Sequence, residues 1–149
     1  MATGPDTCRG GRDHRWLATR LVSVRKQYHF RPGMTGLDAW DVDRLIELSR
    51  DLPIRDADVS TIREVDTPYW FDEWNPPTVR AVLEHLRLIE EVDTAHPIIL
   101  APDGGVMDGM HRVARAMVEG RATIRAVQFA ELPEPDYRNC RPSELPSDD

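Results

Sequence analysis

The chain has 149 residues, of which 40% are hydrophobic and 30% charged, and its formal net charge is −7. This length suits one domain with a real core, and the composition is ordinary for a globular protein. The acidic balance argues against sequence-independent binding of duplex DNA, because that mode depends on an excess of Lys and Arg. No apolar run approaches the length of a membrane span, and the first residues lack the apolar core of a signal peptide.

The chain contains two cysteines, Cys8 and Cys140, one in each polar end. So wide a spacing does not make a disulfide framework, and no Cys/His spacing typical of a metal site occurs. The sequence therefore predicts a cytoplasmic protein without ligands for a protein-bound metal.

Four segments are predicted along the chain. Residues 1–15 are polar and rich in glycine, and are expected to form a disordered tail. Residues 16–50 are expected to be a helical extension, in which Asp38 caps a helix from 39 to 50. Residues 51–130 carry the pattern of the main domain, and residues 131–149, rich in proline and acids, are expected to be a surface-hugging or disordered tail.

The main domain begins with a predicted short strand near 54–59, followed by a loop over 63–77. The loop holds Tyr69, Trp70, Phe71 and Trp74 among acidic residues. These aromatic side chains either line a ligand pocket or anchor a lid of core residues, and the sequence leaves both alternatives open. A helix over 78–92 is expected to be a scaffold, and its His85 to be packed or solvated rather than catalytic.

The predicted apolar positions of that helix recur at helical spacing: Val79, Val82, Leu83, Leu86 and Ile89. A hairpin follows, with strands at 98–100 and 106–107 joined by the turn Asp103-Gly104-Gly105. A helix from Met110 to Glu119, capped by Gly120, and a strand over 122–129 complete the domain. Together these elements predict an α+β fold in which helices pack on a small mixed sheet.

The motif Asp108-Gly109-Met110-His111-Arg112 stands where the second hairpin strand passes into the helix. Unpaired N–H groups and the helix dipole favour an anion there, Gly109 lets it approach closely, and His111 and Arg112 add donors. Asp108 would repel phosphate, so we expect it to orient His111 or Arg112, to hold a metal-bridged phosphate, or to act on a substrate hydroxyl. The alternative is a structural His-Arg pair.

The stretch from Pro97 to Ile124 resembles the core of the ParB/sulfiredoxin superfamily, whose members carry a pattern close to PI-apolar, turn, VIDGxHRxxA. The resemblance covers the motif, the hairpin, the helix and the closing strand. It implies a compact fold of helices and strands that binds a nucleotide, with its phosphates on Gly109, Met110, His111 and Arg112. Sulfiredoxins have a cysteine where this chain has Met110, which excludes their thiol chemistry.

Two other branches of the superfamily bear on function. Chromosome-partitioning ParB proteins bind CTP and DNA and carry a basic balance, whereas this chain is acidic. ParB-like free-serine kinases carry an Asp-Gly-His-His-Arg version that is closest in motif to this one, and they use an acid downstream of the first strand as a base. The acids in a comparable place are Glu64 and Asp66, with Glu73 further on.

These observations favour a small enzyme, a phosphotransferase or nucleotide hydrolase that uses ATP or ADP with Mg²⁺ and acts on a small hydroxylated substrate. In this hypothesis Asp108 with Glu64 or Asp66 is catalytic. The alternative is a nucleotide-sensing module without turnover, compatible with a protein partner or a homodimer. A DNA-binding protein or nuclease is the third hypothesis, and the net charge counts against it.

Overall fold

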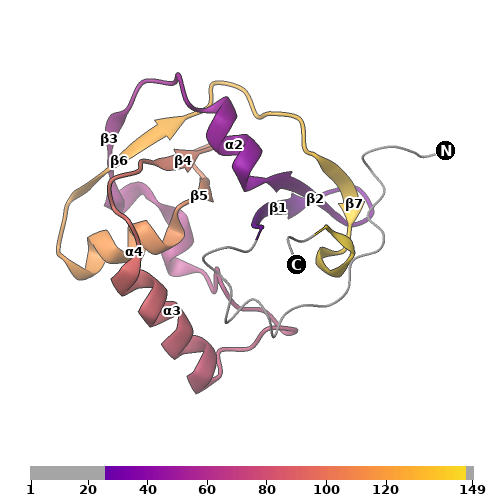
Figure 1. The fold of residues 1–149 in the computed structure, drawn as a ribbon, viewed down its shortest axis with the longest axis horizontal. Helices are drawn as coiled ribbons and strands as arrows, with labels where there is room; N and C mark the ends of the chain where they lie inside the picture. The colour runs from indigo at the N-terminus through magenta and orange to yellow at the C-terminus, as the bar shows by residue number, and fades with distance from the viewer. Residues whose placement is uncertain (1–25, 147–149) are drawn as a thin grey trace. The chain divides into compact units, whose positions relative to one another are not determined.

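The computed structural model describes residues 26–146, which form two compact units: 26–48 together with 133–146, and 49–132. Helices and strands are mixed in the chain, and the predicted α+β class is confirmed (Figure 1). The predicted disordered tail, 1–15, and the first part of the predicted helical extension, 16–25, lie outside the described residues. Across residues 26–146, every helix is too short or too polar to cross a bilayer.

The first unit is built on a three-stranded antiparallel sheet in the order β1-β2-β7. Its strands are β1 (Tyr28–Pro32), β2 (Leu37–Asp41) and β7 (Tyr137–Cys140), and helix α2 (Val42–Leu48) follows β2 directly. A short 3-10 helix, η4 (Pro142–Glu144), follows β7. The small core of this unit joins Ala39, Cys140 and Leu145, and aromatic side chains from β1 and β7 pack on it.

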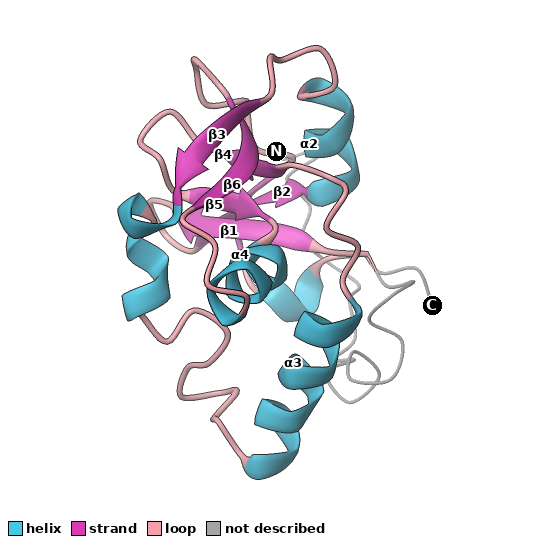
Figure 2. Cartoon of the chain, turned by 90° about the vertical axis from the view of Figure 1, so that its left-hand side faces the viewer, coloured by secondary structure: helices cyan, strands magenta, loops and turns pink. Residues whose placement is uncertain are grey.

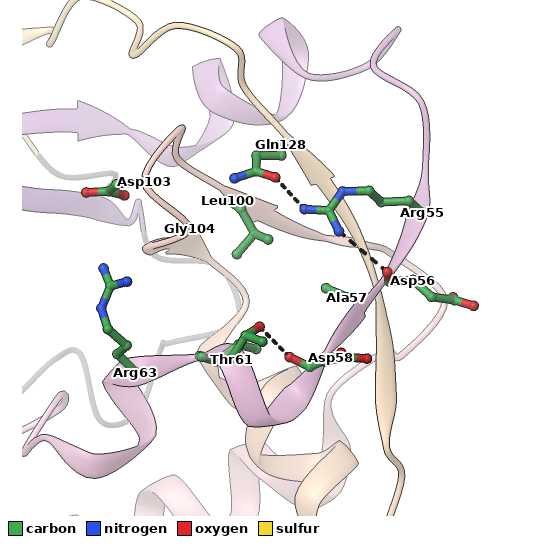
Figure 3. A pocket seen from close by; sticks show the side chains of 11 residues that line it. Arg55, Asp56, Ala57, Asp58, Thr61, Arg63, Leu100, Asp103, Gly104 and Gln128 are labelled. Carbon is green, nitrogen blue, oxygen red and sulfur yellow. Dashed lines mark hydrogen bonds between the residues drawn. The ribbon is translucent and has the colours of Figure 1, made fainter.

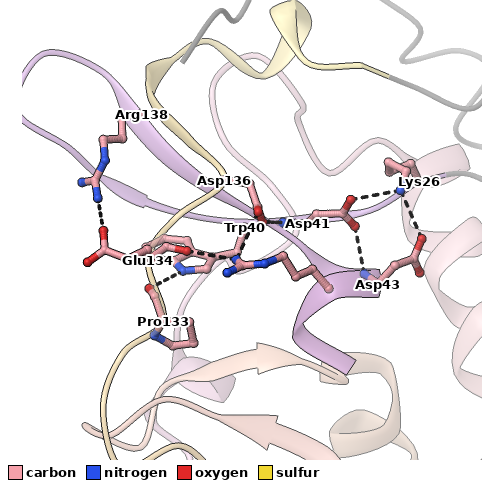
Figure 4. Close-up of polar contacts among 9 residues, drawn as sticks. Lys26, Trp40, Asp41, Asp43, Pro133, Glu134, Asp136 and Arg138 are labelled. Atoms are coloured by element: carbon pink, nitrogen blue, oxygen red, sulfur yellow. Dashed lines mark hydrogen bonds and ion pairs between the residues drawn. The ribbon is translucent and has the colours of Figure 1, made fainter. Parts of the chain in front are cut away.

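Side-chain hydrogen bonds tie the segment before β7 to β2 and α2 (Figure 4). The indole of Trp40 donates to the Pro133 carbonyl at 2.7 Å. Asp136 accepts from the Asp41 N–H at 2.8 Å and from the Arg44 guanidinium at 3.1 Å. Each bond spans more than ninety residues of sequence, so the C-terminal segment is an integral part of this unit.

Two secondary-structure predictions for this unit are wrong, the first residue of α2 and the absence of structure in the C-terminal segment. The helix expected from residue 39 begins at Val42, because Asp41, and not Asp38, accepts the Asp43 N–H, at 2.9 Å. Asp38 instead accepts the N–H of Asn139 on β7, at 3.1 Å.

The expected C-terminal tail contains β7 and η4, since β7 pairs with a strand about a hundred residues away and composition does not reveal such pairing. Cys140 is buried and disulfide-bonded. The other cysteine of the sequence, Cys8, lies outside the described residues.

The second unit contains a four-stranded mixed sheet in the order β3-β6-β4-β5. Its strands are β3 (Arg55–Asp58), β4 (Ile98–Leu100), β5 (Val106–Asp108) and β6 (Thr123–Gln128). The pair β4–β6 is parallel, and the pairs β3–β6 and β4–β5 are antiparallel. All four strands lie where the sequence predicted them, and so does the hairpin turn between β4 and β5.

Two helices complete the second unit: α3 (Val79–Glu91) and α4 (Met110–Val118). Helix α4 packs on β4 and β6, and α3 packs on α4 (Figures 1 and 2). Two 3-10 helices, η2 (Val59–Thr61) and η3 (Arg63–Asp66), follow β3. The core between sheet and helices is formed by Ala57, Ile62, Ile98, Leu100, Val106, Met110, Val113 and Ala126.

Helix α3 has apolar side chains on two faces. Four of the five predicted apolar positions are exposed, at 77% for Val79, 46% for Val82, 56% for Leu83 and 45% for Leu86. The half-buried positions are Ala81, Glu84, His85, Leu88 and Ile89. Helical spacing therefore located the helix correctly, but it could not decide which of two apolar faces packs on α4.

Candidate functional site

The motif at the start of α4 adopts the strand-to-helix turn that its sequence predicted. Gly109 caps the helix with φ at +110°, a left-handed conformation that residues with a Cβ rarely adopt. A Cβ at this position would lie 2.7 Å from Ile98 Cγ2 and 2.9 Å from Arg112 Nη2. Glycine is therefore required by the backbone conformation and by close packing within the protein.

The first turn of α4 retains two backbone donors. The N–H groups of Arg112 and Val113 both donate to the Gly109 carbonyl, at 2.9 and 3.0 Å. Within residues 26–146 no hydrogen bond engages the N–H of Met110 or of His111. These two groups stand at the positive end of the helix dipole, where a phosphate oxygen would be stabilised.

Arg112 forms an ion pair with Asp108, with 3.0 Å between Nη2 and Oδ2, and both side chains are 15% exposed. The same Nη2 donates to the Pro97 carbonyl at 3.3 Å. Arg112 Nε is buried and has no hydrogen-bond partner in residues 26–146. The Nη2 group of the guanidinium is thus held by the protein, whereas Nε remains an unused hydrogen-bond donor.

His111 is part of an aromatic cluster with His85 of α3 and Trp70 of the aromatic loop. Its Nε2 lies 2.9 Å from His85 Nδ1, so a hydrogen bond joins the two imidazoles. Trp70 stacks on both rings, with centroids 4.4 Å from His85 and 4.6 Å from His111. Burial, followed by the charges of His85 and Arg112, lowers the pKa of His111 to about 4, so that His111 is neutral at physiological pH.

A third group of polar side chains lies along β5, beside the motif. Glu64 Oε2 accepts the N–H of Val106 at 2.9 Å, and the Tyr69 hydroxyl donates to the carbonyl of the same residue at 3.4 Å. Glu64 Oε1 is buried and has no partner within the described residues. Burial of the hydroxyl, with the charges of Glu64 and Asp108, raises the pKa of Tyr69 to about 12. Glu64 and Tyr69 therefore bind the backbone of the same residue of β5.

The structure distinguishes Glu64 from Asp66, the two acids that the sequence offered as candidates for the base, both of which lie in η3. Glu64 points to β5, whereas Asp66 is exposed, and no described hydrogen bond or ion pair connects it to the motif. A 3-10 helix has three residues per turn, so positions two residues apart cannot share a face. Met110 packs its side chain into the core and is 6% exposed, which leaves only its N–H to face a ligand.

A polar pocket of about 390 Å³ lies elsewhere in the second unit, between η2 and the hairpin turn (Figure 3). Arg55 and Arg63 approach it from β3 and η3, and Arg55 donates to Gln128. Asp103 and Gly104 belong to the turn that precedes β5, whereas the motif follows β5. We place the candidate site at the motif, because the unpaired helix N–H groups and the buried unpartnered side-chain atoms occur there. No set of three His, Cys, Asp or Glu side chains in residues 26–146 is arranged to hold a metal ion.

The packed alternative for His85 is confirmed, whereas its contact with His111 was not predicted from the sequence. Its helical spacing from Leu88 and Ile89 places it on the face of α3 that packs on α4, and this spacing was the signal available. Of the two alternatives for the aromatic loop, Trp70 fits the core anchor, since it packs on the core and stacks on the His111 ring. Trp74, by contrast, is 75% exposed.

No protein-family model, curated protein or solved structure matches this chain.

Proposed function

We propose that this protein binds a nucleotide, with the phosphates at the start of α4. The observation that carries the proposal is the combination of two unengaged N–H groups, at Met110 and His111, with the buried unpartnered Nε of Arg112. All three are donors, as phosphate oxygens require. The resemblance of the motif to nucleotide-binding members of the ParB/sulfiredoxin superfamily supports the same conclusion.

In this proposal Asp108 positions Arg112. Its Oδ2 accepts from Nη2 at 3.0 Å, which holds the guanidinium in one orientation. Three roles were expected for Asp108: orienting His111 or Arg112, holding a metal-bridged phosphate, or acting on a substrate hydroxyl. A direct contact supports the first of these. Loss of Asp108 should therefore weaken nucleotide binding itself, because Arg112 would no longer be held in one orientation.

A second candidate function, phosphoryl transfer or nucleotide hydrolysis, is favoured by Glu64. Leaving a buried carboxylate oxygen without a partner costs about 1–3 kcal/mol, a cost that active sites commonly carry. Glu64 Oε1 is such an oxygen, and it fits either a base for a small hydroxylated substrate or a ligand to Mg²⁺. Mg²⁺ bound with the nucleotide would neutralise phosphate charge, and one or two carboxylates suffice for that mode of binding.

Nucleotide binding is tested by thermal unfolding with Mg²⁺ and ATP, ADP, CTP or inorganic phosphate. A ligand at one hundred times its Kd stabilises the folded state by about 2.7 kcal/mol. We expect Arg112→Lys to abolish most of this stabilisation, since lysine retains the charge but lacks Nε and the planar fork. Arg121→Lys is the matched control, because Arg121 is exposed and pairs only with Glu119 among the described residues. Equal stabilisation of wild type, R112K and R121K would refute the proposed site.

Catalysis is tested by release of ADP or phosphate from ATP, with and without small hydroxylated acceptors. A positioned base contributes about 10²–10⁴ in rate, so Glu64→Gln should reduce turnover by that factor and change nucleotide affinity much less. Binding without turnover in the wild type would instead identify a nucleotide-sensing module.

A further inference from the structure

The hydrogen bond between His85 and His111 contains a single proton. With 2.9 Å between His85 Nδ1 and His111 Nε2, one nitrogen donates and the other accepts. Two protonated nitrogens facing each other at this distance would repel, so the arrangement excludes a state in which both rings are cations. The planes of the two rings are inclined by only 14°, so the rings are nearly parallel.

The surrounding side chains hold both rings in this orientation. Trp70 lies parallel to them, at interplanar angles of 16° to His85 and 14° to His111. Phe71 contacts the His85 ring edge-on, with centroids 5.4 Å apart. Because three elements contribute to the cluster, neither imidazole can turn without displacing the indole, and the hydrogen bond between the two rings is held in place.

Phosphate oxygens are acceptors only, and this decides which arrangement fits the proposed ligand. A neutral His111 can donate to an anion only if its proton is on Nδ1, since Nε2 is engaged by His85. That tautomer requires Nε2 to accept, and so His85 must donate from Nδ1. In the opposite arrangement the remaining nitrogen of His111 carries a lone pair, which would repel a phosphate oxygen.

We propose that His85 is a positioning residue, which donates its Nδ1 proton to His111 and thereby fixes His111 as the Nδ1–H tautomer, a neutral donor to phosphate. The choice of ligand rests on the proposed function, whereas the tautomer can be measured without any ligand. A neutral donor is suited to this place, because Arg112 already supplies positive charge and burial disfavours a second cation.

The tautomer is read from long-range ¹⁵N–¹H NMR spectra of the free protein at pH 7.5, which distinguish protonated from bare ring nitrogens. Comparison with the spectrum of His111→Gln assigns the ring-nitrogen signals of His111. We expect a bare Nε2 and a protonated Nδ1 for His111, and a protonated Nδ1 for His85. A protonated Nε2 on His111 would overturn the proposal, whether or not a nucleotide binds.

The contribution to binding is measured with Mg²⁺–ATP on two variants of His85. In His85→Asn the side-chain amide nitrogen takes the place of Nδ1 and keeps the donor, whereas His85→Leu fills the space beneath Trp70 without one. We expect about a 10–100-fold loss of affinity for H85L, the value of one hydrogen bond to a charged group, and a loss of no more than about threefold for H85N.

Three results discriminate the outcomes. Equal losses in both variants, with unchanged near-ultraviolet circular dichroism, would mean that His85 only supports packing and would overturn the proposal. If H85L does not fold, the NMR spectra of wild type and H85N decide instead. The expected tautomer without any binding of ATP or phosphate would refute the proposed function while leaving the proton arrangement established.

Discussion

The low pKa of His111 predicts that acid destabilises this protein through one identified side chain. In the unfolded chain a histidine takes up its proton near pH 6.5, whereas burial lowers the pKa of folded His111 to about 4. Between these values the unfolded state binds more protons, so stability falls as the pH falls through this window. Above pH 6.5 the residue is neutral in both states and contributes no pH dependence.

The size of the effect follows from proton linkage. Where only the unfolded state has bound the proton, the free energy of unfolding falls by about 1.4 kcal/mol per pH unit. Integrated from pH 8 to pH 5, the free energy of unfolding falls by about 2 kcal/mol. Partial exposure of His111 reduces the expected value to about 1–2 kcal/mol. The measurement is the free energy of unfolding in urea at both pH values and constant ionic strength, for wild type and for His111→Asn. Carboxylates also titrate near pH 5, and subtraction of the variant removes their contribution.

We expect wild type to lose 1–2 kcal/mol more than H111N between the two pH values. His85, whose pKa is also lowered by burial, is present in both proteins, so its own contribution largely cancels in the comparison. Parallel pH dependence in the two proteins would refute the reasoning, since it would mean that folded His111 takes up its proton as readily as an unfolded one.

Three further predictions concern local structure. Gly109→Ala should destabilise the protein by about 2–4 kcal/mol, because the left-handed backbone is strained and the new Cβ would lie 2.7 Å from Ile98. Gly104→Ala has the same left-handed backbone but open space around its Cβ, and should cost about 1 kcal/mol. Urea unfolding measures both values. Thr78→Ala removes the side chain that caps α3 and should cost about 1 kcal/mol in the same assay, whereas Thr78→Ser should cost little. Trp70→Leu should raise the pKa values of both stacked histidines toward 6.5, as followed by NMR titration, and unchanged values would contradict their burial beneath the indole.

Local signals in the sequence were sufficient for the second unit. Its four strands and α4 all depend on residues close together in the chain: alternating apolar residues, the turn at Gly104, and a helix start at Gly109. The start of α4, and the donors it presents, were therefore predictable from the motif itself. Such features can be predicted without tertiary information, because the geometry of turns and helix caps depends on only a few neighbouring residues.

The first unit was less predictable, since its sheet depends on partners far apart in sequence. Trp40 and its neighbours fit a helical pattern, yet they form β2 because β1 and β7 pair with it from both sides. The same limit applies to the site. Nothing near His85 in the chain indicates that His111 lies 2.9 Å away, and the pairing follows only from the packing of α3 on α4.

The two buried unpartnered atoms beside the motif have opposite character. Arg112 Nε is a cationic donor, Glu64 Oε1 is an anionic acceptor, and both side chains are anchored to the same short strand, through Asp108 and Val106. A site selected for stability alone would gain by joining such groups directly, because each unpaired buried polar atom costs about 1–3 kcal/mol. In the proposed function, Arg112 Nε would serve as a donor to phosphate oxygens and Glu64 Oε1 as an acceptor for a metal ion or hydroxyl. Under the proposed function we expect Glu64→Gln to leave the ligand-free protein at least as stable as wild type while impairing turnover, the trade between stability and activity expected of an active-site carboxylate.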